Sequence, residues 1–413
     1  MGSIKVFAEG SNPKVTDFVN VLDVTGNPKV ELNDDYDTNV DNPFSDMGAW
    51  HAYYLARDGV TNLYGGFPGP LIIGQEYPIN MSDIFSKLTI INSENNTPYD
   101  LSTAKVTFNS YPGKLVETYE LQDFTLNLQL IFANDRTALI KTEISNKLSN
   151  DLSLNLQWSG EIFNKSPYTI SKDEAGNKNY NLNQTLEATD KGIQVNFDDI
   201  NSQWSFFSTK ETKFLCSHEG KVETTVDGNT YTTKLVDAVK IAPNETYKTF
   251  STESYIFTND ELDKEKGKVD EIIKNGDKYF TDNESRWQGY IDKTFANLDK
   301  VPDVSYQNAA VKSIITLITN WRSPAGAIKH NGVIPSLSYK WFVGMWAWDS
   351  WKQAVGTSQF NGDLAKDNIR ALFDYQIKSD DKIRPQDAGA IIDAIFYNQD
   401  EARGGEGGNW NER

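Results

Sequence analysis

The chain has 413 residues, of which 38% are hydrophobic and 12% are aromatic, so a folded protein with a large core is expected and a disordered chain is excluded. The formal net charge is −18, and almost all of it lies in the first 300 residues. Such an acidic surface argues against proteins that bind the phosphates of nucleic acids or anionic membranes. We therefore expect a neutral ligand, with no nucleic acid and no membrane as partner.

Cysteine and histidine are too few for the common metal and disulfide frameworks. The single cysteine, Cys216, excludes an intramolecular disulfide and a thiolate metal cluster. His51, His218 and His330 are far apart and show no metal-ligand spacing, so we interpret them as ordinary structural or surface residues. No run of about 18 apolar residues occurs, and the N-terminal residues lack the order of a signal peptide.

Residues from about 75 to 258 predict a series of short strands. Apolar and polar residues alternate over 126–132, 152–158 and 193–197, which is the period of two of half-buried strands. Asp227-Gly228 between two such runs is a strong hairpin signal. Because no helical pattern intervenes, we predict an N-terminal domain over 1–258 that is a β-sandwich of two antiparallel sheets.

The pattern changes to helical spacing near residue 259. Asn259-Asp260 is predicted to cap a first helix, and a second is expected from about 277 to 295, so that 259–300 forms a helical linker. Pro302-Asp303 predicts the start of a third helix that ends near Trp321. A further helix is expected from about 362 to 376. We interpret 301–413 as an all-α region with long loops.

One of these predicted loops is unusually rich in aromatic residues. A sugar ring has an apolar C–H face and a rim of hydroxyls, so its pocket needs aromatic plates beside hydrogen-bonding groups. The segment supplies both, since Asp349 and Lys352 lie among four of the ten tryptophans of the chain, Trp341, Trp346, Trp348 and Trp351. The alternative is that the aromatic rings fill a helix-packing core and that Asp349 is a cap.

Two more predicted loops carry polar groups suited to vicinal diols. The segment 384–387 places a guanidinium, an amide and a carboxylate within four residues. The segment 404–408 contains four glycines, which free the backbone to approach a ligand, and amide, indole and charged residues follow it. Its spacing differs from phosphate-binding and dinucleotide-binding patterns. The alternative for the glycines is a flexible loop.

Several of these segments resemble bacterial members of glycoside hydrolase family 63, which also contains the eukaryotic processing glucosidase that trims mannosyl-oligosaccharides. The resemblance runs over most of the chain in the same order, whereas residues between about 75 and 260 match only in general pattern. The Trp-Asp-Ser-Trp-Lys and Gly-Gly-Asn-Trp-Asn-Glu-Arg motifs are the most specific. The matching segments are 42–51, 65–70, 321–327, 346–354, 384–387 and 404–413.

The resemblance implies a fold and a reaction. The fold is an N-terminal β super-sandwich, a helical linker and an (α/α)6 barrel whose loops hold the active site. The reaction is hydrolysis of an α-glucosidic bond in an α-glucoside or oligosaccharide with inversion. One carboxylic acid protonates the leaving oxygen and a second carboxylate activates water. The resemblance implies no metal or cofactor, and it suggests a periplasmic or secreted location.

By the same resemblance, Asp349 is an active-site carboxylate of the −1 subsite that contacts the sugar or positions the attacking water. Indole rings on both sides would partly desolvate it, and Lys352 would keep it ionised. Glu412 is either a catalytic acid or a structural partner of Arg384 or Arg413. The candidate sugar contacts are Trp348, Trp351, Lys352, Arg384, Gln386, Asn409, Trp410 and Glu412.

Three N-terminal residues, Trp50, His51 and Phe67, belong either to loops that reach over the barrel mouth or to the packing between domains. The sequence departs from the family because an (α/α)6 barrel needs twelve helices, whereas three or four are expected after residue 300. In the family, the general acid and base lie downstream of the Asn-Trp-Asn-Glu-Arg motif. We therefore expect a truncated piece of a longer glycosidase, inactive alone.

Two other functions remain open at this point. One is a non-catalytic carbohydrate-binding or interaction module, which the predicted all-β part and the acidic surface favour. The other is a trehalase or a sugar phosphorylase on the same barrel.

Overall fold

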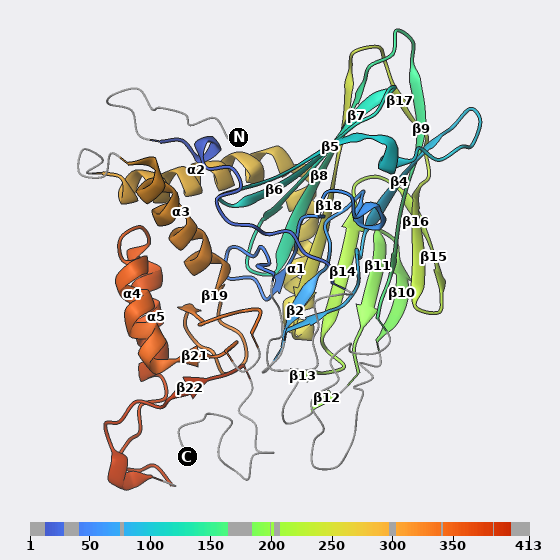
Figure 1. Cartoon of the computed structure of the whole chain (residues 1–413). Helices are drawn as coiled ribbons and strands as arrows, with labels where there is room; N and C mark the ends of the chain where they lie inside the picture. The colour runs from blue at the N-terminus through green and yellow to red at the C-terminus, as the bar shows by residue number, and fades with distance from the viewer. Residues whose placement is uncertain are drawn as a thin grey trace.

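In the computed structural model of the chain, a β-sandwich lies beside a group of helices (Figure 1). The strands of the sandwich occupy most of the first 260 residues, and helices follow in the rest of the chain. The structure describes residues 13–28, 41–74, 78–163, 184–198, 200–201, 207–296, 303–339, 342–382 and 384–397.

The larger sheet of the sandwich has eight antiparallel strands in the order β10-β11-β14-β18-β8-β7-β6-β5. Its centre is formed by the two longest neighbours, β8 and β18, which pair from Thr137↔Ser254 to Ser145↔Thr246. In chain order the strands are β5 (Lys105–Tyr111), β6 (Lys114–Glu120), β7 (Phe124–Phe132), β8 (Thr137–Asn146), β10 (Thr185–Thr189), β11 (Gly192–Asn196), β14 (Lys213–His218) and β18 (Thr246–Ile256).

The second sheet has five strands and contains the predicted hairpin. Its order is β15-β16-β9-β17, and β4 also pairs with β9. At the turn between β15 and β16, Gly228 has φ +60°, a conformation that glycine adopts without steric cost. The hairpin prediction is therefore confirmed. The strands are β4 (Lys87–Asn92), β9 (Leu152–Glu161), β15 (Val222–Asp227), β16 (Thr230–Leu235) and β17 (Val239–Ile241).

The two sheets bury the apolar side of each alternating strand between them. In β7 and β9 the residues that point inward include six leucines with 0 to 2% exposure, Leu126, Leu128, Leu130, Leu152, Leu154 and Leu156. Burying a side chain of this size contributes about 1.5 to 3 kcal/mol relative to leaving it exposed. The period of two in the sequence thus becomes the sandwich core, and the fold fits the predicted sandwich-like N-terminal domain.

Short elements complete the first part of the chain and were not predicted. A three-stranded sheet joins β1 (His51–Ala52), β2 (Leu71–Ile73) and β3 (Pro78–Asn80), and β12 (Ile200–Asn201) pairs with β13 (Phe207–Ser208). The prediction missed these strands because each has two or three residues, too few for a period to show. Among the described residues, the 3-10 helix η1 (Val15–Asp17) precedes β1, whereas η2 (Thr61–Leu63) and η3 (Leu101–Thr103) lie between strands.

The helices begin close to where the sequence placed them. α1 (Asn259–Lys274) is capped by Thr258, whose hydroxyl accepts a hydrogen bond from the Glu261 amide, so the predicted cap at Asn259 is off by one residue. α2 (Gly276–Thr294) follows directly. Asp303 caps α3 (Val304–Thr319) as predicted, by accepting from the Ser305 amide.

The region after residue 303 differs from its prediction in two ways. The segment Ala347–Thr357, predicted as part of a loop, forms the helix α4, and α5 (Gly362–Phe373) follows it. Short strands also occur there, so the all-α prediction was incomplete: β19 (Trp321–Arg322), β20 (Gly332–Val333), β21 (Met345–Trp346) and β22 (Ala394–Ile395), with the 3-10 helix η5 at Pro385–Asp387. The helices α3, α4 and α5 of the described residues do not by themselves form an (α/α)6 barrel.

A buried carboxylate fixes α2 to the N-terminal segment. Asp46 is fully buried and accepts hydrogen bonds from the Arg286 guanidinium at 2.6 Å and from the Trp287 indole at 2.7 Å. The Trp287 ring in turn lies against Gly113, where a Cβ would approach the indole nitrogen to 1.9 Å. The close contact therefore requires glycine in the turn between β5 and β6.

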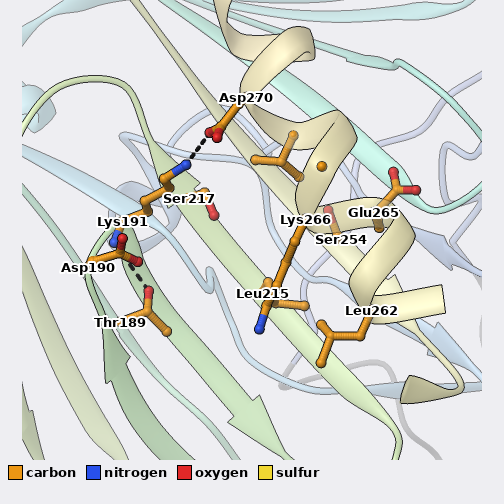
Figure 2. A pocket seen from close by; sticks show the side chains of 12 residues that line it. Thr189, Asp190, Lys191, Leu215, Ser217, Ser254, Leu262, Glu265, Lys266 and Asp270 are labelled. Carbon is orange, nitrogen blue, oxygen red and sulfur yellow. Dashed lines mark hydrogen bonds and ion pairs between the residues drawn. The ribbon is translucent and has the colours of Figure 1, made fainter. Parts of the chain in front are cut away.

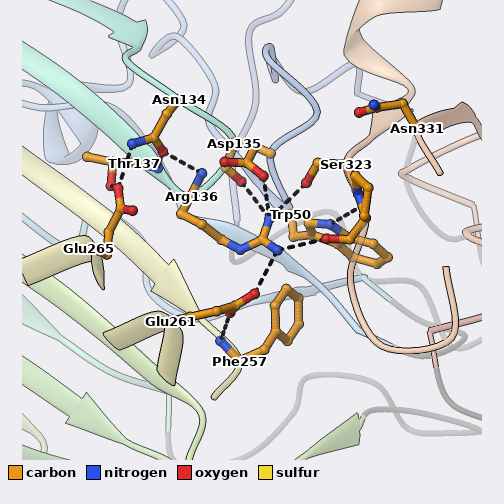
Figure 3. Close-up of polar contacts among 12 residues, drawn as sticks. Trp50, Asn134, Asp135, Arg136, Thr137, Phe257, Glu261, Glu265, Ser323 and Asn331 are labelled. Atoms are coloured by element: carbon orange, nitrogen blue, oxygen red, sulfur yellow. Dashed lines mark hydrogen bonds and ion pairs between the residues drawn. The ribbon is translucent and has the colours of Figure 1, made fainter. Parts of the chain in front are cut away.

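A buried guanidinium joins three separate parts of the chain (Figure 3). Arg136, which precedes β8, donates to Ser323 Oγ at 2.8 Å and to the Pro324 carbonyl at 2.9 Å. It also pairs with Glu261 of α1 at 2.9 Å. Since Arg136 is 6% exposed, these contacts replace the water that a guanidinium would otherwise hold.

We expect Arg136→Met to destabilise the protein by about 2 to 4 kcal/mol, because Ser323, the Pro324 carbonyl and Glu261 lose a shared buried partner. Urea unfolding measures this change. A matched control is Arg370→Met, since the Arg370–Asp367 pair lies on the surface of α5 and should contribute less than about 1 kcal/mol. Equal losses in both variants would contradict a junction role for Arg136.

Four titratable groups are buried in the sandwich interior. Burial raises the pKa of Glu117 to about 8 and that of Glu253 to about 7. Tyr119 and Tyr53 donate hydrogen bonds to these two carboxyl groups. Burial also lowers the pKa of His51 and His218 to about 3. Near pH 6, the folded protein therefore holds Glu117 and Glu253 mostly protonated and His51 and His218 neutral.

These shifts predict how stability depends on pH. Between about pH 6.5 and 8 the folded Glu117 and Glu253 retain protons that the unfolded chain has released, so the free energy of unfolding falls as pH rises. Between about pH 4.5 and 6.5 the two histidines, protonated only when unfolded, oppose this slope.

We expect the free energy of unfolding to fall by about 2 kcal/mol between pH 6.5 and 8, and urea unfolding measures this change. In Glu117→Gln the side chain is neutral at every pH, so the dependence of the free energy of unfolding on pH should become weaker. Glu120→Gln, at a half-exposed surface carboxylate, should leave it unchanged. A slope that Glu117→Gln does not alter would contradict the assignment.

Candidate functional site

The candidate site lies at the start of α4. β21 pairs with β22 through Met345↔Ile395 and Trp346↔Ala394, and the Ala347 amide donates to the Asp393 carbonyl at 2.8 Å. On the inner side of α4, the Ser350 carbonyl accepts from the buried Asn368 side chain of α5 at 3.1 Å. The first turn of α4 is therefore held from two sides, and its other face is open.

Asp349 lies in this first turn. Its side chain is half-buried, and the atom Oδ2 is buried with no hydrogen-bond partner among the described residues. Burial raises the pKa of the Asp349 carboxyl, and the positive charge of Lys352 partly opposes that rise. A carboxylate with an unused oxygen can accept a hydrogen bond from a ligand hydroxyl or from water.

Two indole rings flank this carboxylate and are exposed. Trp348 is 52% exposed and Trp351 is 37% exposed, which is unusual for side chains of this size. The Trp348 ring meets Trp346 with centroids 5.4 Å apart, and Trp346 lies 5.4 Å from Phe342. Phe342, Trp346 and Trp348 thus form a connected row of rings that ends at an exposed indole.

The structure adds Phe373 at the end of α5, which was not among the predicted site residues. Its ring is 50% exposed and lies edge-on to Trp351 with centroids 6.2 Å apart. Phe373 lies within the helix expected from about 362 to 376, and only the packing of α5 against α4 reveals that its ring is exposed. No signal in the sequence separates it from a core residue.

The polar groups of 384–387 bind one another. Arg384 Nε donates to Asp387 Oδ2 at 2.7 Å, and the Arg384 amide donates to Asp381 Oδ1 at 2.8 Å. Gln386 is exposed. Within the described part of the chain, no hydrogen bond or ion pair joins this group to Asp349. The remaining candidate residues, Trp341, Asn409, Trp410 and Glu412, lie outside the described residues.

Of the two alternatives for the N-terminal residues, the structure supports packing. Trp50 is 1% exposed, its indole donates to the Ser323 carbonyl at 3.2 Å, and its ring meets Phe257 edge-on. His51 and Phe67 are buried as well. The Trp50–Ser323 hydrogen bond connects the N-terminal segment to the segment after α3.

Metal-ligand clusters and membrane-spanning helices are both absent from the described ranges. No group of three or more His, Cys, Asp or Glu there could hold a metal ion. None of the helices in that part of the chain combines the length and the apolar character needed to cross a membrane.

Comparisons with known proteins identify relatives. The family model for the N-terminal region of glucosidase YgjK matches residues 23–288. A protein assigned as a kojibiose phosphorylase, from the human microbiome, superposes with a TM-score of 0.52 at 12% identity over 85% of this chain and 49% of that chain. The family 92 glycosyl hydrolase ccman5 superposes with a TM-score of 0.41 at 10% identity, over 86% of this chain and 48% of that chain.

These similarities differ in what they establish. At 12% identity, the phosphorylase match shows a shared fold alone. The chain spans about half the length of both solved proteins. The family match covers well over half of this chain, so the protein belongs to the family of the N-terminal region of glucosidase YgjK.

Proposed function

We propose that the protein is a glycoside hydrolase related to family 63 that cleaves α-glucosidic bonds with inversion. Membership in a glucosidase family supports a carbohydrate-active enzyme. The motifs around 346–354 and 404–413 support the finer assignment. Because the chain spans about half the length of its structural neighbours, we propose the activity for the natural gene product.

The observation that carries the proposal is the unpartnered Asp349 oxygen beside exposed indoles. Trp348 and Trp351 offer flat apolar surfaces for the C–H face of a pyranose. Asp349 accepts a hydrogen bond from a hydroxyl of that sugar or from the attacking water. The contacts use exposed rings and a carboxylate oxygen that has no hydrogen-bond partner among the described residues.

In an inverting mechanism one carboxylic acid protonates the leaving oxygen while a carboxylate activates water on the opposite face of the ring. We assign Asp349 to the −1 subsite, where it orients water or sugar. Lys352 favours its ionised form. We assign the general acid and the general base to no residue of this chain. Arg384 and Gln386 remain proposed sugar contacts. Arg384 becomes available to a sugar when the ligand replaces Asp387 as its hydrogen-bond partner.

The proposal includes a domain division. Residues 1–258 form the sandwich domain, 259–300 the helical linker, and 301–413 contribute the first helices of an (α/α)6 catalytic domain. The end of β18 at Ile256 and the start of α1 at Asn259 support the first boundary. The packing of α4 against α5 supports a helical hairpin of the kind that such barrels repeat.

A sugar phosphorylase is the second candidate, because the chain shares its fold with a protein assigned as a kojibiose phosphorylase. Both reactions need the same recognition of a glucosyl ring. They differ in the nucleophile, which is water in the hydrolase and phosphate in the phosphorylase.

We expect the natural gene product to hydrolyse an α-linked glucose disaccharide, such as kojibiose or maltose, and to release β-glucose first. Proton NMR during the first minutes of turnover distinguishes the two anomers before they equilibrate. Initial release of α-glucose, or no turnover of any α-linked glucose disaccharide, would contradict the proposal. A strict requirement for inorganic phosphate would establish the second candidate.

We expect Asp349→Asn to lower kcat by about 100-fold or more, because the amide cannot replace a carboxylate that holds water or a hydroxyl. The fold should be unchanged, as circular dichroism can show. Asp363→Asn is a matched control, since Asp363 occupies the first turn of α5 and its side chain is 95% exposed.

Both carboxylates interact favourably with the dipole of their helix. A merely structural role of Asp349 would therefore change stability by a similar amount in the two variants and would leave kcat near normal.

A further inference from the structure

A groove separates α1 from the larger sheet on the side of β11 and β14 (Figure 2). Its volume is about 430 Å³, within the usual range for small-molecule sites. We call it the α1 groove. One wall is α1, the other is the turn between β10 and β11 with the neighbouring part of β14, and it is separate from the candidate site on α4.

The groove exists because α1 packs closely on only part of the sheet. Val269 and Ile272 of α1 are buried with Leu139 and Phe250 of β8 and β18. α1 packs most closely on β18, and the groove opens on the side of β14. There Leu215 is half-buried and Ser217 is short, whereas Phe214 and Cys216 point into the sandwich core. The alternation of β14 therefore supplies small or aliphatic side chains to the floor of the groove.

A glycine in the middle of α1 borders the groove. A Cβ added at Gly267 would meet no atom within 4 Å, so packing does not require glycine here. Glycine inside a helix reduces stability relative to alanine. The missing side chain leaves the backbone of α1 open to the groove, and a ligand can use that space.

The charged groups of the groove are balanced and come from both walls. Lys191 of the turn forms an ion pair with Asp270 of α1 (Figure 2). Lys266 of α1 and Asp190 of the turn line the same groove, and neither forms an ion pair in the part of the chain that the structure describes. Glu265 is occupied elsewhere, because Thr137 donates to it at 2.6 Å.

We propose that the α1 groove is a non-catalytic binding site for a neutral saccharide. Lys266 donates a hydrogen bond to one ligand hydroxyl, and Asp190, on the opposite wall of the groove, accepts one from another hydroxyl. Leu215 and Leu262 contact the apolar C–H face of the ring. A neutral polyol uses donors and acceptors at once, whereas an anion would meet the two aspartates and a protein of net charge −18. The site is independent of the proposed catalysis.

The test uses the full 413-residue chain with the substitutions Trp348→Ala and Trp351→Ala. These substitutions remove the two exposed indole rings of the candidate active site. Maltose is the probe, and saturation-transfer difference NMR measures its binding. We expect binding with a Kd in the millimolar range, because the described residues that line the groove include no aromatic side chain.

Gly267→Gln places a side chain in the groove and should weaken maltose binding at least tenfold. Gly289→Gln is the matched control, because Gly289 lies inside α2 and also has no atom within 4 Å of an added Cβ. It should bind maltose as the background does. Both substitutions raise helix propensity, so neither should lower Tm.

Three outcomes would overturn the proposal: no maltose signal in the double-alanine background, equal binding in the Gly267→Gln and Gly289→Gln variants, or tighter binding of glucose 6-phosphate or of glycine betaine than of maltose. Loss of turnover in the enzyme assay would not bear on any of them, so failure of this site and failure of the proposed hydrolase are distinguishable.

Discussion

The buried guanidinium of Arg136 is the contact on which the relation between the two halves of the chain depends. A charge taken out of water must be compensated by hydrogen bonds and opposite charge. Arg136 finds these in Glu261 of α1 and in Ser323 and Pro324 beyond α3. The sheet, the linker helix and the segment leading to α4 are therefore tied at one point.

The position of the candidate site follows from this junction. The segment held by Arg136 also contacts Trp50 and the Gly48 carbonyl, which explains why the N-terminal aromatic residues are buried. From there the chain leads through β21 to the first turn of α4. Asp349 is placed by a backbone that is fixed on both sides, as its proposed role in orienting a ligand requires.

Much of the architecture could be predicted because its signals are local. The alternation over 126–132 and 152–158 gave strands β7 and β9, and Asp227-Gly228 gave the β15–β16 turn. The helix over 347–357 was missed because its tryptophans suggested a loop site and because no side chain caps it. In the candidate site, the sequence predicted the aromatic residues and Asp349. The partners of Arg384, which are Asp387 and Asp381, were set by the conformation of its loop.

The sequence by itself determined the period of the strands, the acidic charge and the presence of a tryptophan-rich segment around one carboxylate, because each is a property of neighbours along the chain. Only the tertiary structure decided which rings are exposed, that Phe373 joins Trp351, and that α1 stands away from β14. Those features depend on the distance between elements far apart in sequence, which packing sets and a local pattern does not contain.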